Sequence, residues 1–425
     1  MKVFKFGGAS VSTAERIKNL PAILKQYNDD KLLIVISAMG KTTNALEKVV
    51  DAFFDGEKEK ALQLFTEIKH QHIELASALT SEHTNQSTAD LLNEFFTEVE
   101  WLLHDKPVRG YDYYYDQIVC VGELLSSAIV SSFLNASGIK NKWIDVRDVI
   151  RTDDNFRDAR IDWRYSEERV NETVLPAIKK HSIVITQGFI GATDENESTT
   201  LGREGSDYTA AVFANLLNAE CQVIWKDVQG VMNADPKQYE SAEWIRELNY
   251  QEVIEMAYYG AQVIHPKTIK PLQNKSIPLF VKSFINPDAE GTIIHNQKVG
   301  ELPPIIVYKN NQVLVQLKSK DYSFVSEGLT AYVYDVFQSL RFKPNLTQNA
   351  AISLLCVVDD KPNKVEQLAL RAAENFDVNV TKDLCLLTVR HYNDDILGEL
   401  VKDSEVLLKQ QTPGTVQVLM RNATK

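Results

Sequence analysis

The chain has 425 residues, of which 44% are hydrophobic and 24% are charged, with 46 lysines and arginines against 58 aspartates and glutamates. This length exceeds what one hydrophobic core normally organises, so it predicts two or three domains of ordinary globular composition. The net charge of −12 argues against a general surface for nucleic acid or anionic membranes, although a local basic pocket is compatible with it.

The sequence gives no indication of a membrane segment or of export. No apolar run approaches the ~20 residues that span a bilayer, and the opening Met1–Lys5 is too short and too soon charged for a signal peptide. The cysteines are widely spaced, so we expect buried, reduced thiols rather than disulfide partners or metal ligands. They are Cys120, Cys221, Cys356 and Cys385. These features predict a cytoplasmic protein.

From residue 1 to about 285, short apolar strands alternate with amphipathic helices. This pattern predicts an α/β fold, with a mainly parallel sheet covered by helices on both faces. Between Thr43 and Phe133 the pattern is helical, with one clear break at Lys106–Gly110, and we expect this block to pack beside the sheet. The expected core strands are Val3–Phe6, Leu32–Ser37, Lys142–Val146, Ser182–Gln187, Gln222–Lys226 and Pro278–Lys282.

A domain boundary is expected in the turn-rich stretch Asn286–Thr292 and the prolines Pro303 and Pro304 that follow it. This predicts one domain over residues 1–290 and a second region over residues 304–425. The second region has shorter units, whose order predicts two small βαβ modules in tandem, the second one abbreviated. Its expected elements are strands Ile305–Lys309, Val313–Lys318, Ala351–Val358, Val378–Asp383, Leu384–Arg390, Glu405–Gln411 and Thr415–Arg421, and helices Gly328–Leu340, Lys364–Asn375 and Ile396–Val401.

Near its start the chain places paired glycines, Gly7 and Gly8, between a strand that ends in Lys5-Phe6 and a helix. Paired glycines let backbone N–H groups approach a polyanion, and a helix N-terminus adds positive potential. Lys5 adds an ammonium, so the segment predicts a phosphate site. A tight turn with a solvated lysine is the alternative, because neither a Walker loop nor a dinucleotide fingerprint is present. Ser12–Glu15 has the pattern of a capping box that starts the helix.

Two further segments offer contacts for a small polar ligand. Ser37 ends a predicted strand, and Thr43 lies at the next helix start, where hydroxyl and free N–H groups can hold a carboxylate. Glu123 lies off the apolar stripe of the helix Gln117–Phe133. It is either solvated, as most such glutamates are, or a partner for a substrate ammonium.

The segment Thr199–Ala210 is a glycine-flanked loop that opens a helix. Arg203 offers a planar fork suited to a carboxylate or phosphate. Asp207 lies in the first helical turn, where the dipole alone would favour an acid. Together these residues predict a site. The next strand ends in Lys226-Asp227, and an acid at a strand end before a glycine turn is a common arrangement at the edge of a nucleotide.

Downstream residues are less distinctive. Asp235 followed by proline is commonly only a turn, and Lys267 lies at a helix start. His265 is expected to be structural, because no metal-ligand partner lies nearby. The sequence predicts no metal site built from side chains alone.

In this order, the motifs resemble those of the aspartate kinases, in the amino-acid kinase superfamily. The resemblance implies a three-layer αβα kinase domain that transfers a phosphoryl group from ATP, with Mg²⁺, to the β-carboxylate of L-aspartate, at the start of lysine, threonine and methionine biosynthesis. It implies that residues after 304 form ACT domains, which bind amino-acid effectors and join a homodimer. The matching segments are Lys5–Val11, Ser37–Asn44, Gly122–Leu124, Gln187–Gly191, Thr200–Tyr208, Asp227–Lys237 and Glu255–Lys267.

The same resemblance implies roles for individual residues. Lys5 would contact the transferred phosphoryl group, and Asp207 would organise the reacting groups. Glu123 would face the ammonium of aspartate and Arg203 its α-carboxylate. The other implied aspartate contacts are Ser37 and Thr43. The implied nucleotide contacts are Lys5, Gly7, Gly8, Ser10, Lys226, Asp227, Met232, Lys237 and Lys267.

Several positions depart from the family pattern. Lys226 stands where a small hydroxyl residue is usual, Met232 where an aromatic residue is often found, and Glu204 interrupts a glycine-rich loop. These departures weaken the implication about the nucleotide more than the one about phosphate. Asn345 stands where lysine-sensitive relatives carry an aspartate, although Ser326–Leu329 resembles their effector loop. We therefore expect weak or absent lysine inhibition, with the ACT region kept mainly for dimerisation.

Two other classes of function stay open. Glutamate, acetylglutamate and uridylate kinases share a phosphate loop of this type, but Glu123, Arg203 and the ACT-like tail favour aspartate. A catalytically silent amino-acid sensor is the second class, and the presence of Lys5, Arg203 and Asp207 argues against it. A fused homoserine dehydrogenase is not expected, because no further nucleotide-binding pattern follows before Lys425.

Overall fold

The computed structural model describes residues 1–79 and 82–422, and the chain divides into two compact units. The second unit takes in two segments that precede residue 290, so the division is not a single cut in the sequence. The first unit comprises Met1–Val231, Trp244–Ile254 and Val263–Val299. The second comprises Met232–Glu243, Glu255–Gln262 and Gly300–Lys425.

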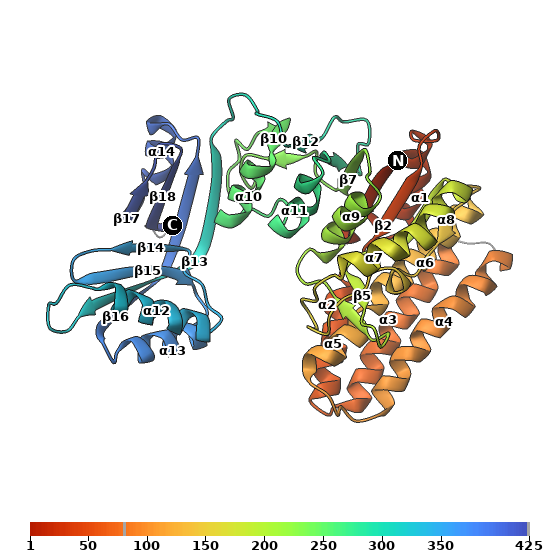
Figure 1. The fold of residues 1–425 in the computed structure, drawn as a ribbon, viewed down its shortest axis with the longest axis horizontal. Coiled ribbons are helices and arrows are strands. Elements are labelled where there is room, and N and C mark those ends of the chain that lie inside the picture. Colours follow the sequence, from red (N-terminus) through yellow and green to blue (C-terminus); the bar gives the residue numbers. More distant parts are fainter. Residues whose placement is uncertain (80–81, 423–425) are drawn as a thin grey trace. The chain divides into compact units, whose positions relative to one another are not determined.

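An eight-stranded sheet forms the centre of the first unit, in the order β10-β12-β11-β7-β1-β2-β4-β3 (Figure 1). The six strands from β11 to β3 run parallel, and β12 is antiparallel to β11. All six predicted core strands are therefore confirmed within one sheet. The strands are β1 (Lys2–Phe6), β2 (Leu32–Ile36), β3 (Lys142–Trp143), β4 (Ile183–Gln187), β7 (Cys221–Lys226), β10 (Glu247–Asn249), β11 (Leu279–Ser283) and β12 (Thr292–His295).

The central strands follow from their sequences. All five residues of β2 are buried, as expected for an apolar run covered on both faces. The strand β3 is shorter than predicted, because the chain turns after Trp143 into a 3-10 helix over Val146–Asp148. The Asp145 side chain caps this turn by accepting a hydrogen bond from the Arg147 N–H at 2.9 Å.

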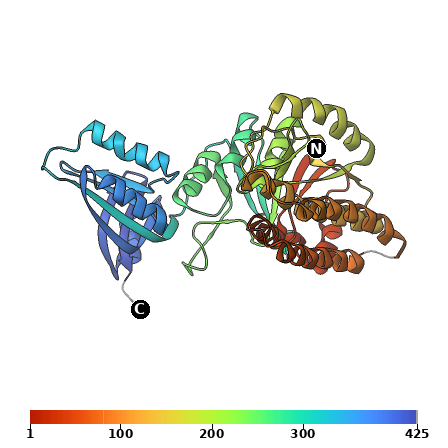
Figure 2. The same cartoon turned by 90° about the horizontal axis from the view of Figure 1, so that it is seen from below.

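Helices lie on both sides of this sheet, with α3 and α4 on one side and α7 and α8 on the other (Figure 2). The predicted helical block contains a second break that the sequence analysis missed. Asp55–Glu57 ends α2, with Gly56 at a φ of +81°. The helices are α1 (Ala14–Lys25), α2 (Thr42–Phe54), α3 (Lys58–Leu79), α4 (Glu82–His104), α5 (Tyr111–Val119), α6 (Val121–Ala136), α7 (Trp163–Arg169), α8 (Leu175–His181), α9 (Gly205–Leu216), α10 (Tyr250–Tyr259) and α11 (Pro266–Asn274).

One helical stretch, Tyr111–Ala136, passes a length and hydropathy test for a membrane span, when the described residues are searched. However, 89% of its most apolar window is buried inside the protein. Its apolar surface is therefore covered by protein, as in the core helix of a globular fold. The stretch is this long because α5 and α6 follow each other with only Cys120 between them.

The start of α1 differs from the prediction by one residue. Thr13, rather than Ser12, is the N-cap, and its hydroxyl accepts from the Arg16 N–H at 3.3 Å. Before it, residues Gly8–Val11 form a separate 3-10 turn. The paired glycines therefore lead into this short turn and not directly into the long helix.

The second unit contains a six-stranded antiparallel sheet in the order β14-β15-β13-β16-β18-β17. Two pairs of predicted strands merge here into the long strands β13 and β16, whose pairing shifts near Lys309–Gln312. Sequence analysis missed the short strand β14. The elements are β13 (Ile305–Ser319), α12 (Glu327–Ser339), β14 (Leu346–Asn349), β15 (Ser353–Asp359), α13 (Pro362–Ala372), β16 (Phe376–Arg390), α14 (Asp394–Val401), β17 (Ser404–Gln411) and β18 (Thr415–Asn422).

The helices of this unit pack on the sheet through two separate hydrophobic clusters. Helices α12 and α13 pack through residues such as Phe337 and Leu368 on Val315 and Cys356. Helix α14 packs through Leu397 on a separate cluster of the later strands. The first half of the sheet therefore has two covering helices and the second half has one. This arrangement resembles two ferredoxin-like modules, the second lacking a helix.

Candidate active site

The carboxyl ends of β1, β2 and β4 meet at one edge of the sheet, because these strands are parallel neighbours. Ligands bind at this edge in open α/β sheets. A cavity of about 440 Å³ lies there, bounded by the loops after these strands and by residues of α2, α5, α6 and α9. The predicted site residues that line it are Lys5, Gly8, Ser37, Thr43, Glu123, Arg203 and Asp207.

A buried ion pair forms the floor of the cavity. Lys5 lies in the central strand β1, where alternation turns it away from the face that Phe4 and Phe6 occupy. Its Nζ lies 2.6 Å from Oδ1 of Asp207, and the two side chains are 11% and 5% exposed. Burial alone would raise the pKa of Asp207, but Lys5 and Lys226 outweigh it and lower that pKa. Asp207 is therefore an anion that holds the Lys5 ammonium in place.

The loop after β1 touches the loop after β2 through backbone atoms. A Cβ on Gly8 would lie 2.6 Å from the carbonyl oxygen of Ala38 and 3.2 Å from that of Gly40. The N–H of Gly40 donates to the Gly8 carbonyl at 3.0 Å, and Gly40 has a φ of +52°. Only glycine fits at Gly8 without a shift of the backbone. The paired-glycine motif thus brings two backbone loops together at the cavity.

Glu123 is the buried acid of the cavity. It lies in the first turn of α6, is 3% exposed, and accepts a hydrogen bond from the Ala38 N–H through Oε1 at 3.2 Å. Its other oxygen, Oε2, is buried and has no hydrogen-bond partner among the described residues. Burial raises the pKa of Glu123 to about 8. This arrangement suits a ligand that brings a cation to Oε2. The alternative of a solvated glutamate is wrong, because the side chain is buried.

Arg203 lies on a loop whose conformation depends on two glycines and on one residue with a left-handed backbone. Gly202 has a φ of +77°, and Glu204 has a φ of +55°, stabilised by the His265 N–H, which donates to the Glu204 carboxylate at 2.8 Å. A Cβ on Gly205 would lie 2.6 Å from the ring of Phe189. The Arg203 side chain is exposed and forms no hydrogen bond or ion pair with other described residues. Its guanidinium is thus free to bind an anion.

The remaining predicted residues do not line the cavity. A Cβ on Gly7 would lie 3.4 Å from Lys5 Nζ, so Gly7 is adjacent to it. Ser10 is fully buried, and its hydroxyl donates to the Trp225 carbonyl at 3.3 Å, which is a structural contact. Lys226 donates to the Val263 carbonyl at 2.8 Å.

Lys267 lies beside the Arg203 loop, where its Nζ is 2.8 Å from Asp158 Oδ1 and 2.9 Å from the Leu201 carbonyl. His265 is the N-cap of α11, so its predicted structural role fits the structure. Asp227 is exposed at the end of β7.

Met232 and Lys237 belong to the second unit. The N–H of Lys237 donates to Asp235 Oδ1 at 3.0 Å, which forms the turn expected from Asp235-Pro236.

Sequence analysis missed a second part of the cavity wall, formed by Tyr115, Arg157 and Thr200. The buried carboxylate of Asp116 supports it. Asp116 Oδ2 accepts from the N–H groups of Thr200 and Arg157 at 2.8 and 3.0 Å, and Oδ1 accepts from the Thr200 hydroxyl at 2.6 Å. Burial raises the pKa of Asp116 to about 6. The signal in the sequence that could have indicated this wall is Asp116 itself, an aspartate at an apolar position of α5.

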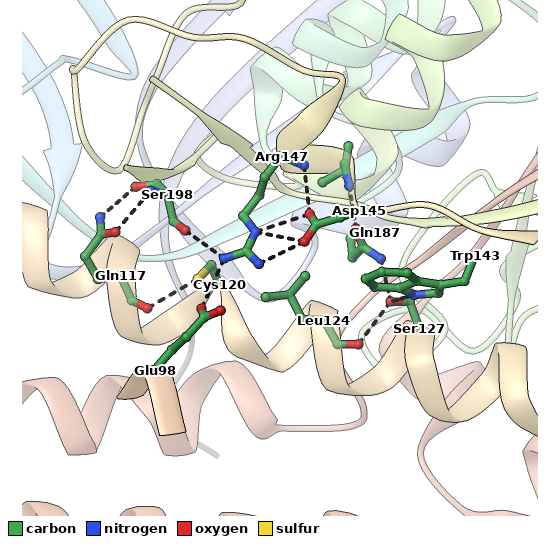
Figure 3. A network of polar contacts seen from close by, with 11 residues as sticks. Glu98, Gln117, Cys120, Leu124, Ser127, Trp143, Asp145, Arg147, Gln187 and Ser198 are labelled. Atoms are coloured by element: carbon green, nitrogen blue, oxygen red, sulfur yellow. Dashed lines mark hydrogen bonds and ion pairs between the residues drawn. The ribbon is translucent and has the colours of Figure 1, made fainter. Parts of the chain in front are cut away.

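A polar network joins α6 to the sheet through Ser127, Trp143 and Gln187 (Figure 3). The Ser127 hydroxyl donates to the Leu124 carbonyl at 3.1 Å and accepts from Gln187 at 2.7 Å and Trp143 at 2.9 Å. In the same network Arg147 pairs with Asp145. Because each polar group has a partner, the network holds the first turns of α6 in one position.

The cavity therefore combines basic and acidic side chains. Lys5 and Arg203 can bind anionic groups, while Glu123 can bind a cation, and the hydroxyl groups of Ser37 and Thr43 add hydrogen bonds. Such a set suits a small zwitterion with an extra negative charge, next to a backbone loop suited to phosphate.

Comparisons with known proteins agree with this chemistry. The model of the amino acid kinase family matches residues 1–283. Lysine-sensitive aspartokinase 3 of Escherichia coli (strain K12) is 32% identical over 362 residues, which cover 84% of this chain and 78% of that protein. Bifunctional aspartokinase/homoserine dehydrogenase 1 of Arabidopsis thaliana is 33% identical, and the matched part covers 32% of its length.

A solved structure is similar along the whole chain. The crystal structure of Escherichia coli aspartokinase III in complex with aspartate and ADP has a TM-score of 0.82 and 26% identity, and the match covers 99% of this chain and 96% of that one. The same protein with lysine and aspartate also has a TM-score of 0.82. On the family match and the identity with the Escherichia coli relative, this chain belongs to the amino acid kinase family and, within it, to the aspartokinases.

Proposed function

We propose that this protein phosphorylates the β-carboxylate of L-aspartate with ATP, giving 4-phospho-L-aspartate, the first intermediate toward lysine, threonine and methionine. The observation that carries the proposal is the unpaired, buried Oε2 of Glu123, in the same cavity as the Lys5–Asp207 pair and the Arg203 guanidinium. An acidic amino acid supplies a cation for Glu123 and anions for the two basic groups.

Aspartate recognition is assigned to four residues of the cavity wall. The ammonium of aspartate pairs with Glu123, and its α-carboxylate pairs with Arg203, whose planar fork matches a carboxylate. Ser37 and Thr43 add hydroxyl contacts. Pairing with the substrate ammonium lowers the pKa of Glu123, since an opposite charge favours the ionised form. Binding therefore couples to the loss of a proton from Glu123.

The nucleotide phosphates are assigned to the backbone around Gly7 and Gly8, beside Lys5. The residues proposed for the rest of the nucleotide are Lys226, Asp227, Met232, Lys237 and Lys267. Ser10 is proposed to act indirectly, because its hydroxyl already donates to the Trp225 carbonyl. It would support the backbone N–H groups of the phosphate loop without binding phosphate itself.

Phosphoryl transfer to a carboxylate needs no general base, because the acceptor is already an anion at neutral pH. A bond forms between a β-carboxylate oxygen and the γ-phosphorus, the bond to the bridging oxygen breaks, and ADP leaves with the electron pair. The difficulty is the approach of two anions. Lys5, held in place by Asp207, supplies positive charge where the β-carboxylate and the γ-phosphate meet. The backbone loops after β1 and β2 supply N–H groups to the phosphates.

Mg²⁺ is proposed to arrive with the nucleotide. One carboxylate together with phosphate oxygens and water is a common set of ligands for this ion, and Asp207 is the carboxylate beside Lys5 in the cavity. Bound there, the ion would neutralise phosphate charge.

A hydroxamate assay tests the proposal directly. Purified protein with ATP and Mg²⁺ is given L-aspartate, and acyl phosphate is trapped with hydroxylamine. We expect hydroxamate with aspartate and none with glutamate or acetylglutamate, and no ADP formation with UMP. Absence of aspartyl hydroxamate, with intact binding of aspartate, would instead support a silent sensor.

We also propose that the second unit binds an amino-acid effector and joins a homodimer, and that the protein works in the cytoplasm. The antiparallel sheet with helices and the four free, buried cysteines support these assignments.

A further inference from the structure

The cavity wall contains an arginine whose backbone is strained. Arg157 lines the cavity and has a φ of +69°, in the left-handed region that favours glycine. A side chain in this region costs free energy, and such residues persist where the surrounding structure determines them. A glycine at this position would carry no such cost.

Three contacts hold Arg157 in place. Its backbone N–H donates to the fully buried carboxylate of Asp116 at 3.0 Å. Its guanidinium lies 4.4 Å from the centre of the Tyr115 ring and pairs with Asp112 Oδ1 at 3.1 Å. Tyr115 also lines the cavity, and its hydroxyl donates to Glu47 at 2.8 Å. The ring that supports the guanidinium is therefore itself fixed.

Asp116 connects Arg157 to a second cavity residue. The same carboxylate binds the N–H and the hydroxyl of Thr200, so it sets the distance between two segments of the wall. Asp116 has no exposed surface, and neither of its oxygens faces solvent. Burying the Asp116 carboxylate costs free energy. We therefore infer that the position of Arg157, which this carboxylate holds, matters for binding a ligand.

Three cationic residues line the cavity, namely Lys5, Arg157 and Arg203. Lys5 is held by the buried Asp207, whereas the partner of Arg157, Asp112, is 61% exposed and therefore a weaker competitor for the guanidinium than a buried carboxylate would be. Arg157 can exchange this solvated partner for a carboxylate of a bound ligand. Acidic aspartate carries two carboxylates, and Arg203 accounts for one of them.

We propose that Arg157 is a further substrate-binding residue, which contacts a carboxylate of the acceptor amino acid and is positioned by Asp116. This inference rests on the proposed function. It assigns the strained loop at residue 157 to acceptor recognition and not to the nucleotide.

The test is the kinetics of Arg157→Gly and Arg157→Gln. The first removes both the guanidinium and the strain, and the second removes the charge but keeps the strain. Loss of a charged hydrogen bond predicts a rise in KM for aspartate on the order of 10- to 100-fold in both variants, with KM for ATP within about twofold of wild type. The thermal midpoint of Arg157→Gly should stay within about 3 °C of wild type, because relief of strain offsets the lost surface contacts.

Asn196→Gly is the matched control. Asn196 also has a positive φ, of +62°, but lies in an exposed turn that does not line the cavity. Its kinetics should equal those of wild type.

Three results overturn the inference and leave the proposed function standing. If wild type makes aspartyl hydroxamate but both Arg157 variants keep the wild-type KM for aspartate, only the role of Arg157 fails. The same holds if KM for ATP rises instead, or if only the glycine variant is affected, since backbone geometry would then be the cause. If wild type makes no aspartyl hydroxamate, the proposed function and this inference fail together.

Discussion

The ammonium of Lys5 and the carboxylate of Asp207 lie 2.6 Å apart and are almost completely buried, although 202 positions in the sequence separate them. The central strand supplies the cation and the first turn of α9 supplies the anion. The attraction between the two charges offsets the free-energy cost of burying each of them. The pair therefore links the stability of the fold to the charge that the proposed reaction needs.

This link changes what a Lys5 variant should do. Lys5→Met removes the cation and leaves the Asp207 carboxylate buried without its partner. We expect kcat to fall by about 10²- to 10³-fold and the free energy of unfolding at pH 7 to fall by about 3–5 kcal/mol. Hydroxamate assays and urea unfolding measure the two quantities.

The double variant Lys5→Met/Asp207→Asn separates the loss of turnover from the loss of stability. It should recover most of the lost stability and none of the activity. Because Lys5 lowers the pKa of Asp207, the stability that it provides exists above the ordinary aspartate pKa and is lost as the pH falls through the lowered one. The difference between wild type and Lys5→Met should accordingly shrink in acid. A constant difference would contradict the assignment of the stability loss to the unpaired carboxylate.

Glu123 predicts a proton release that accompanies aspartate binding. With a pKa of about 8, its carboxyl group is protonated at pH 7 without a ligand, and it must ionise to pair with the substrate ammonium. Calorimetric titrations of aspartate at pH 7 in two buffers of different ionisation enthalpy should show close to one proton released. Glu123→Gln should release none and should bind aspartate more weakly. Equal heats in both buffers for wild type would exclude this coupling.

The same group gives a signed dependence of stability on pH. The unfolded chain loses the Glu123 proton near pH 4.5, whereas the folded protein keeps it to about 8. The stability that this residue contributes is therefore complete below pH 4.5, declines between pH 4.5 and about 8 with a slope of up to about 1.4 kcal/mol per pH unit, and levels off above that. Glu123→Gln should lack this component of the decline.

Gly8 provides a steric prediction. Its added Cβ would lie 2.6 Å from the Ala38 carbonyl oxygen, and backbone atoms cannot turn aside as a flexible side chain can. Gly8→Ala should lower the free energy of unfolding by about 1–3 kcal/mol and should impair ATP turnover, because the two loops must separate. Gly110→Ala is the matched control, since among the described residues no atom beyond its own chain neighbours lies within 4 Å of its added Cβ. Equal effects of Gly8→Ala and Gly110→Ala would show that the contact with the Ala38 carbonyl oxygen is not the cause.

The parts that sequence analysis predicted well are those with a local signal. The six core strands are apolar runs between turns, and the cavity residues from Lys5 to Asp207 lie at strand ends or helix starts, where parallel topology gathers them. Arg157 and Asp116 had no such signal. The role of Asp116 depends on a loop 41 residues later in the chain that folds back onto α5, and the left-handed φ of Arg157 has no signature in an arginine. Merging of the predicted strands into β13 and β16 likewise depends on pairing between distant segments.

Lysine is bound to the Escherichia coli relative in one of its solved structures. In this chain the amide oxygen of Asn345 already accepts a hydrogen bond from the protein's own Lys309 at 2.6 Å, and its amide nitrogen donates to Asp359 at 2.8 Å. If an effector lysine bound here, as the family resemblance implies, its ammonium would have to displace Lys309 and would meet the uncharged amide of Asn345 in place of the aspartate that the resemblance implies. We expect less than a twofold change in activity during a lysine titration of wild type. Lys309→Met/Asn345→Asp, which frees the position and supplies the carboxylate, should increase the response, whereas strong inhibition of wild type by lysine would show that Lys309 and Asn345 do not block the effector.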